Sequence, residues 1–141
     1  MPEKRTLERA QKDRRSGKAP STQAGEFVRE EVEHVRKGKH GVRSPKQAIA
    51  IGLSKARKAG VAIPENPNAK KKSAKGVTRK KSSESPRRRA RASLKALRRE
   101  PTSTVSPAAM GKQAHESAVR RGPKKRRAAS LKAARTRHAH A

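Results

Sequence analysis

The sequence predicts a mostly disordered chain with α-helical segments: a small helical hairpin at about 23–60 and basic arms that are only conditionally helical. Two observations lead to this fold class. Lys and Arg number 40 among 141 residues, against 11 Asp and Glu, so the net charge is +29. Hydrophobic residues make up 30% of the chain, and Phe27 is its single aromatic residue. A chain of this composition buries too little apolar surface to offset the entropy lost on ordering.

The two halves of the chain differ in charge and in apolar content. Residues 1–65 hold 16 Lys or Arg and 8 acidic residues, whereas residues 66–141 hold 24 and 3. Large apolar side chains are concentrated in the first half. We therefore expect three regions: a charged leader at 1–22 in which a short helix can form, a helical hairpin module at 23–63, and a basic low-complexity tail at 64–141.

The first helix of the hairpin is expected at about 23–37. Its acidic residues come early and its basic residues come late, which complements the helix dipole at both ends. Gly38 follows where a C-cap glycine belongs. The apolar residues recur at helical spacing and form one stripe, made of Ala24, Phe27, Val28, Val32 and Val35.

The second helix of the hairpin begins with a clear capping signal. Ser44 stands at the N-cap position, Pro45 at the first helical position and Gln47 at the third, so Ser44 and Gln47 can form a capping box. The helix is expected to end at Gly60, with Leu53 on its contact face. Three small residues spaced four apart leave a shallow side that lets another helix approach closely: Ala48, Gly52 and Ala56.

The tail contains a repeat, with copies at 85–98 and 122–135 that lie 37 residues apart. Each copy reads Pro, a basic run, then Ala-Ser-Leu-Lys-Ala. Between the copies, residues 107–121 have helix-forming composition and are followed by Gly122. Alanine, Arg and Lys favour helix, but adjacent like charges oppose it in free solution. We therefore expect these segments to become helical on contact with a polyanion.

One part of the hairpin resembles a known family. Residues 24–61, with Gly38-Lys39-His40-Gly41 and the run Lys-Gln-Ala-Ile-Ala-Ile-Gly-Leu-Ser at 46–54, resemble a family of small basic bacterial proteins of unassigned function. The resemblance implies a bacterial source and a helical module, and it supplies no active site. The Ala-, Lys- and Arg-rich tail is similar to bacterial histone-H1-like proteins in composition only.

Nucleic acid is the expected partner, because a net charge of +29 needs a polyanion and the release of condensed counterions supplies the driving force. We expect non-enzymatic, largely sequence-independent binding, with DNA favoured over RNA, and a nucleoid-associated or compacting role in the cytoplasm. The predicted phosphate contacts are Lys70, Lys71, Lys72, Arg79, Lys80, Lys81, Arg87, Arg88, Arg89, Arg91, Lys124, Lys125, Arg126 and Arg127.

Other readings of the same features stay open. The hairpin can instead be a protein-interaction module, with the tail serving as an RNA or ribosome tether. It can also form a homodimer. A sequence-reading helix-turn-helix is disfavoured, because the link at 38–43 is longer than that motif's tight turn.

Several classes of function are not expected. The absence of Cys excludes disulfides and Cys-based zinc sites. No apolar run suits a signal peptide or a membrane span, so we expect no membrane partner. His138 and His140 form a pair with no third ligand in view, so no metal site, cofactor or small-molecule substrate is expected. Three acidic residues on the first helix are interpreted as solvated helix formers rather than acid–base groups: Glu30, Glu31 and Glu33.

Overall fold

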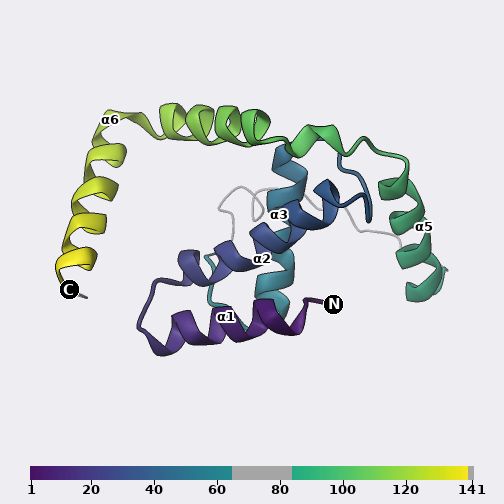
Figure 1. The fold of residues 1–141 in the computed structure, drawn as a ribbon, viewed down its shortest axis with the longest axis horizontal. Helices are drawn as coiled ribbons and strands as arrows, with labels where there is room; N and C mark the ends of the chain where they lie inside the picture. The colour runs from purple at the N-terminus through teal and green to yellow at the C-terminus, as the bar shows by residue number, and fades with distance from the viewer. Residues whose placement is uncertain (65–83, 140–141) are drawn as a thin grey trace, which may run out of the picture. The chain divides into compact units, whose positions relative to one another are not determined.

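The computed structural model describes residues 1–64 and 84–139, and most of them are helical (Figure 1). No strand occurs within these two ranges. The prediction of a mostly disordered chain is therefore wrong. The elements in chain order are α1 (Lys4–Arg15), α2 (Pro20–Arg36), α3 (Pro45–Lys58), α5 (Pro86–Arg98), the 3-10 turn η1 (Ser103–Val105) and α6 (Pro107–Ala139).

The error has two physical causes. Average composition hides the local capping that starts the tail helices: the Ser85 hydroxyl accepts a hydrogen bond from the backbone N–H of Arg88, and Pro86 opens α5. Average composition also hides extra packing on the hairpin, because α1 and η1 each contact it. Both effects lower the cost of ordering below the value that the net charge suggests.

The chain divides into two compact units, residues 1–105 and residues 106–141. In the first unit, α2 packs against both α1 and α3 (Figure 1). The predicted apolar stripe of α2 is confirmed, since Phe27 and Val35 are fully buried and Ala24 and Val32 nearly so. Phe27 lies in a cluster that α1 and α3 complete with one alanine each, so the expected leader helix is part of the packed unit.

The predicted shallow side of α3 is also confirmed. Ala48 and Ala56 have no exposed surface, and Gly52 is buried between them. A Cβ at Gly52 would lie 2.6 Å from the Cα of Val28, so the backbones of α2 and α3 pass too close for any other residue. Leu53, expected on the contact face, packs against the core from a half-buried position.

The N-terminus of α3 has the Ser44 half of the predicted capping box, and the Gln47 side chain bonds to the residue before the N-cap instead of to the N-cap itself. The Ser44 hydroxyl accepts from the backbone N–H of Gln47 at 3.4 Å. In return, the Gln47 side-chain oxygen accepts from the backbone N–H of Arg43 at 2.8 Å. The first bond satisfies an N–H group that the helix itself leaves without a partner, and the second fixes the backbone just before the N-cap.

The loop between α2 and α3 binds the last turn of α5 and the segment that follows it. The backbone N–H of Gly41 donates to the carbonyl of Leu97 at 2.9 Å, and that of Val42 donates to Pro101 at 3.1 Å. A Cβ at Gly41 would collide with the carbonyl of Glu100. Val42 and Val105 are both fully buried. Residues 97–105, which the sequence-based division assigns to the tail, therefore pack on the loop of the hairpin.

The second unit consists of α6, which buries no residue. Gly122 has φ 75° and ψ 165°, a non-helical conformation that interrupts α6 and produces helical segments at 107–121 and 123–139. This matches the predicted helix end before Gly122. Both copies of the repeat are helical from their proline onward, at Pro86 and at Pro123. Among the described helices, none is long and apolar enough to cross a membrane.

Candidate nucleic-acid interface

One of the predicted basic runs, at 87–91, lies on α5. The helix buries none of its residues, and among the described helices it packs against no other. Arg88 pairs with Glu84 at 3.5 Å. Its three neighbours in the predicted set form no ion pair with any described residue: Arg87, Arg89 and Arg91.

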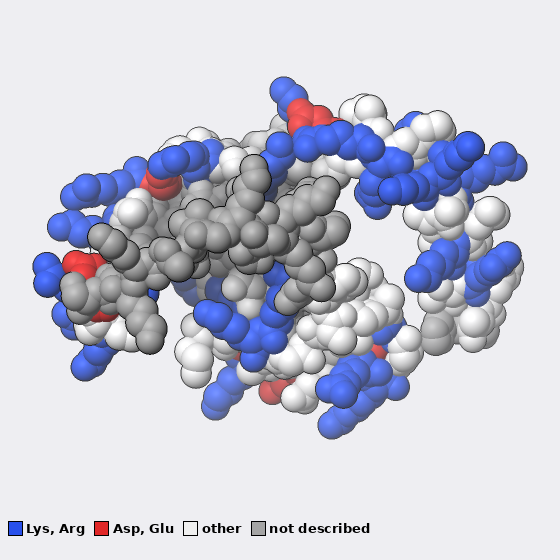
Figure 2. Space-filling model, turned by 180° about the vertical axis from the view of Figure 1, so that it is seen from behind, with Lys and Arg blue, Asp and Glu red and all other residues white. Residues whose placement is uncertain are grey.

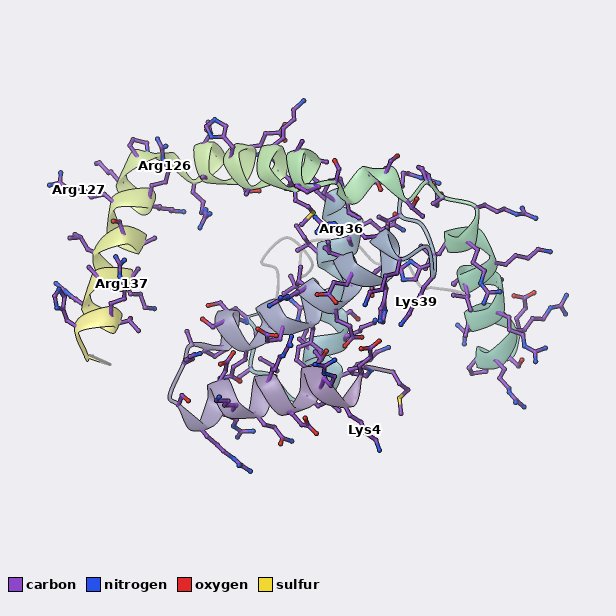
Figure 3. The ribbon with its side chains drawn as sticks, in the orientation of Figure 1. Lys4, Arg36, Lys39, Arg126, Arg127 and Arg137 are labelled. Carbon is purple, nitrogen blue, oxygen red and sulfur yellow. The ribbon has the colours of Figure 1, made fainter. Side chains whose placement is uncertain are left out.

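Another predicted basic run, at 124–127, opens the 123–139 segment of α6. Its four residues are exposed, and none forms an ion pair within the described ranges: Lys124, Lys125, Arg126 and Arg127. Figure 3 shows Arg126, Arg127 and Arg137 projecting outward from this segment. The structure thus supports exposed helical positions for both runs.

The remaining predicted contacts lie outside the described residues. On the described surface drawn in Figure 2, Lys and Arg side chains spread over the helices in view, and Asp and Glu side chains form only small patches. The six predicted residues that fall in the range 65–83 are Lys70, Lys71, Lys72, Arg79, Lys80 and Lys81.

A buried charge cluster on α2 was missed by the sequence analysis. Glu30 is 5% exposed and Glu31 is 1% exposed, so the interpretation of both as solvated helix formers is wrong. Glu33, the third of that set, is half-buried and pairs with Arg29 on its own helix. The reason for the error is tertiary, because packing of α1 and α3 on α2 covers the two side chains.

Lys55 of α3 supplies the compensating charge. Its Nζ lies 2.7 Å from Oε2 of Glu31 and 3.3 Å from Oε1 of Glu30. Burial by itself lowers the pKa of Lys55, but the hydrogen bond and charge of Glu31, followed by those of Glu30, leave the pKa raised. For Glu30, burial raises the pKa, and hydrogen bonds from Thr6, Glu3 and Lys55 outweigh it, so the net pKa is lowered.

Two histidines extend the cluster toward the α2–α3 loop. Oε1 of Glu3 lies 2.8 Å from Nε2 of His34 and 3.0 Å from Nζ of Lys39. Hydrogen bonds from His34 and then Lys39 lower the pKa of Glu3 to about 2. His40 Nε2 lies 3.2 Å from Oε1 of Glu31. Each histidine side chain is 12% exposed.

This cluster contains three side chains of the kinds that coordinate metal ions, and they lie close together. One atom each from Glu31, His34 and His40 lies within 4.8 Å of the other two. The signal in the sequence is the Glu-x-x-His spacing of Glu31 and His34, which places both on one side of a helix. The contribution of His40 from the following loop has no comparable signal. The C-terminal histidine pair is not part of this set of three side chains. His138 is exposed on α6, and His140 lies outside the described residues.

Comparison with known proteins matches one part of the chain. Residues 3–67 match the model of a family of unknown function, DUF6496. The match agrees with the resemblance to a family of unassigned function, and it covers α1, α2 and α3 together. No curated protein and no solved structure matches the chain.

Proposed function

We propose that this chain is a non-enzymatic, largely sequence-independent nucleic-acid-binding protein that contacts DNA phosphates through its Lys/Arg-rich arms. The observation that carries the proposal is the pair of exposed basic runs that open α5 and the 123–139 segment of α6. Apart from Arg88, the residues of these runs have no acidic partner among the described residues. Nucleoid association and DNA compaction are the roles that such binding would serve.

The position of the basic runs strengthens the case for phosphate as their ligand. Both runs occupy the first turn of a helix, at Arg87–Arg89 and at Lys124–Arg127. The N-terminus of a helix carries a partial positive charge, so cations there destabilise the free helix. A phosphate placed at such a terminus interacts favourably with both the side chains and the free N–H groups. Binding would therefore relieve repulsion that is present in the free arms.

The buried position of Phe27 favours duplex over single-stranded partners. Recognition of single strands by stacking needs exposed aromatic side chains. Phe27, the one aromatic residue of the chain, has no exposed surface. Phosphate contacts carry no sequence information, so the arms would bind different DNA sequences alike.

The salt dependence of DNA binding tests the proposal. The affinity of the chain for a labelled duplex should fall with a log–log slope of about −0.9 for each phosphate neutralised. Replacing Lys124, Lys125, Arg126 and Arg127 together by Gln should reduce the slope by up to about four contacts' worth and weaken scrambled duplexes equally. Replacing Arg87, Arg88, Arg89 and Arg91 by Gln should have a similar effect.

A matched control removes the same charge from the packed helices. Gln at Lys12, Arg14, Arg15 and Lys58, which are exposed and form no ion pair within the described ranges, lowers the net charge equally. This control should change the slope far less than either arm variant. Equal slopes for all three variants would mean that total charge, rather than the arms, drives binding.

A second experiment separates the proposal from its alternative, a protein-interaction module with an RNA or ribosome tether. Crosslinking in cells, followed by sequencing of the bound nucleic acid, should recover mainly DNA spread over many sequences. Recovery of ribosomal or other RNA would favour the alternative. Deletion of 106–141 leaves the first compact unit complete and should lower DNA recovery, because it removes the basic run at Lys124–Arg127.

A further inference from the structure

The ring of His40 shows an unusual arrangement of hydrogen-bonding groups. Its Nδ1 lies 3.1 Å from the carbonyl oxygen of Gly41. A carbonyl oxygen can only accept, so Nδ1 must carry a proton and donate it. In the neutral ring, Nε2 then holds a lone pair, and it faces Oε1 of Glu31 at 3.2 Å. Two electron-pair acceptors at this distance repel one another unless a cation lies between them.

A third ligand-type side chain lies beside this pair. His34 follows Glu31 by one helical turn, and its ring meets that of His40 edge to face, with centroids 6.5 Å apart. One atom of each of the three side chains lies within 4.8 Å of the others. Glu31 is almost fully buried, and both rings are largely so. Two imidazoles and one carboxylate form a ligand set that zinc binds in proteins, with one position left open.

The surroundings orient these side chains as the neighbours of metal ligands do. The Gly41 carbonyl fixes the tautomer of His40, and the carboxylate of Glu3 lies 2.8 Å from Nε2 of His34. The ammonium group of Lys55 lies 2.7 Å from the other oxygen of Glu31, Oε2, while Oε1 lies 3.2 Å from Nε2 of His40.

The charges around the cluster accommodate a divalent cation. The three carboxylates of Glu3, Glu30 and Glu31 outnumber the two ammonium groups of Lys39 and Lys55. With both histidines neutral, the cluster therefore has a net negative charge that a metal ion would offset. The ammonium group of Lys55 lies on the Oε2 side of Glu31, away from the contact between Oε1 and His40.

We propose that Glu31, His34 and His40 bind one divalent transition-metal ion, zinc by preference, at the junction of α2 and the α2–α3 loop. His40 immediately precedes Gly41, whose backbone N–H donates a hydrogen bond to the carbonyl of Leu97. The ion would thereby stabilise the loop on which residues 97–105 pack. This inference does not depend on the proposed DNA binding.

Cobalt titration of the full chain tests the site directly. Co²⁺ should produce visible d–d absorption of a low-coordinate site with a stoichiometry of one, and Zn²⁺ should abolish that absorption by displacement. His34→Gln and His40→Gln should each weaken Co²⁺ binding by at least about tenfold. Two matched controls should retain wild-type affinity, namely His115→Gln and the double variant His138→Gln with His140→Gln.

A measurement on the unsubstituted chain covers the case in which a variant fails to fold. Zinc should shift the ring NMR signals of His34 and His40 while leaving those of His115 unchanged. Loss of cobalt binding in the His138/His140 variant alone would overturn the proposal, as would the absence of any d–d absorption. The proposal would also be wrong if His40 is doubly protonated at neutral pH and its ring signals do not change when zinc is added. In that case a proton is the cation between His40 and Glu31.

Discussion

The helices of residues 1–64 and those of the arms differ in what keeps them helical. In the packed unit, α2 buries Phe27 and Val35 against α1 and α3, and a glycine allows the closest approach. In contrast, α5 and α6 bury no residue at all. The first group is stabilised by tertiary packing, and the second by intrinsic propensity and capping. One chain thus contains helices whose stability responds to different substitutions.

The helices of the packed unit and those of the arms also differ in how their charged side chains are paired. In the packed unit, acidic residues neutralise cations at short range, as Lys55 and Glu31 do at 2.7 Å. Along the arms, the basic runs follow one another with few acids between them. In the packed unit, the charged side chains are buried and paired, and they contribute to the stability of the fold. In the arms, the exposed like charges repel one another and are available to bind an external anion.

The largest expected effect is that of Lys55→Met. This variant leaves Glu30 and Glu31 buried without their cation, which should lower the free energy of unfolding by about 2–3 kcal/mol, allowing for partial exposure of Lys55. Urea denaturation followed by circular dichroism measures the change. Lys58→Met, on the exposed side of the same helix, is the control and should stay within about 0.5 kcal/mol of wild type. Equal losses would show that the buried pairing contributes nothing.

Next in size is Gly52→Ala, which places a Cβ 2.6 Å from the Cα of Val28. Overpacking against backbone should cost about 2 kcal/mol in the free energy of unfolding. Gly25→Ala on α2 is the matched control, since a Cβ there meets nothing within 4 Å. It should stabilise the chain by about 0.5–1 kcal/mol through helix propensity. Urea denaturation of both variants measures the two changes in the free energy of unfolding. A Gly52→Ala variant that is more stable than wild type would disprove the close approach of α2 and α3.

Gly41→Ala should separate the two regions from one another. A methyl group there collides with the Glu100 carbonyl, so residues 97–105 should detach at a cost of about 1–2 kcal/mol, while α1 to α3 stay folded. Hydrogen exchange should show lost protection at Gly41 and Val42 and unchanged protection at Phe27. Loss of protection at all three positions would mean that the packed helices depend on this segment.

The pH dependence of stability should come from the packed unit. The pKa of Glu30 is lowered from 4.5, so its ionised form stabilises the fold above pH 4.5, and this contribution is lost as pH falls through the folded-state pKa. The pKa of Lys55 is raised from 10.5, so its contribution is complete below pH 10.5 and is lost as pH rises further. Thermal unfolding from pH 2 to 12 should therefore show a plateau between these limits. In Lys55→Met, the alkaline decline should disappear.

The smallest expected effect is that of salt on the free arms. Added NaCl screens the repulsion between adjacent cations and should stabilise each arm helix by about 0.2–0.5 kcal/mol per relieved pair. A chain shortened to residues 1–105 should show a smaller gain in helicity by circular dichroism than the full chain, because it lacks α6. A larger gain in the shortened chain would contradict our description of α6 as a propensity-driven helix.

Several local features of this protein could be predicted from its amino-acid sequence. The stripe around Phe27, the N-cap at Ser44, the shallow side at Gly52 and the break at Gly122 all follow from helical periodicity and backbone preference. The basic runs at 87–91 and 124–127 were expected to become helical only on contact with a polyanion, whereas both lie on helices that open with a proline and contain strong helix formers.

Only the tertiary structure decided which charges are buried and which segments meet. Glu30 and Glu31 look like surface residues in the sequence, and they are buried in the unit in which α1 and α3 pack on α2. The juxtaposition of Glu31 with His40, and of Gly41 with Leu97, joins residues that no helical period relates. Periodicity describes neighbours along one helix, whereas these contacts depend on how a loop turns and on which backbones approach most closely. The sequence alone therefore determined the apolar stripe, the α3 N-cap and the glycine breaks of the helices, and packing determined the buried charge cluster.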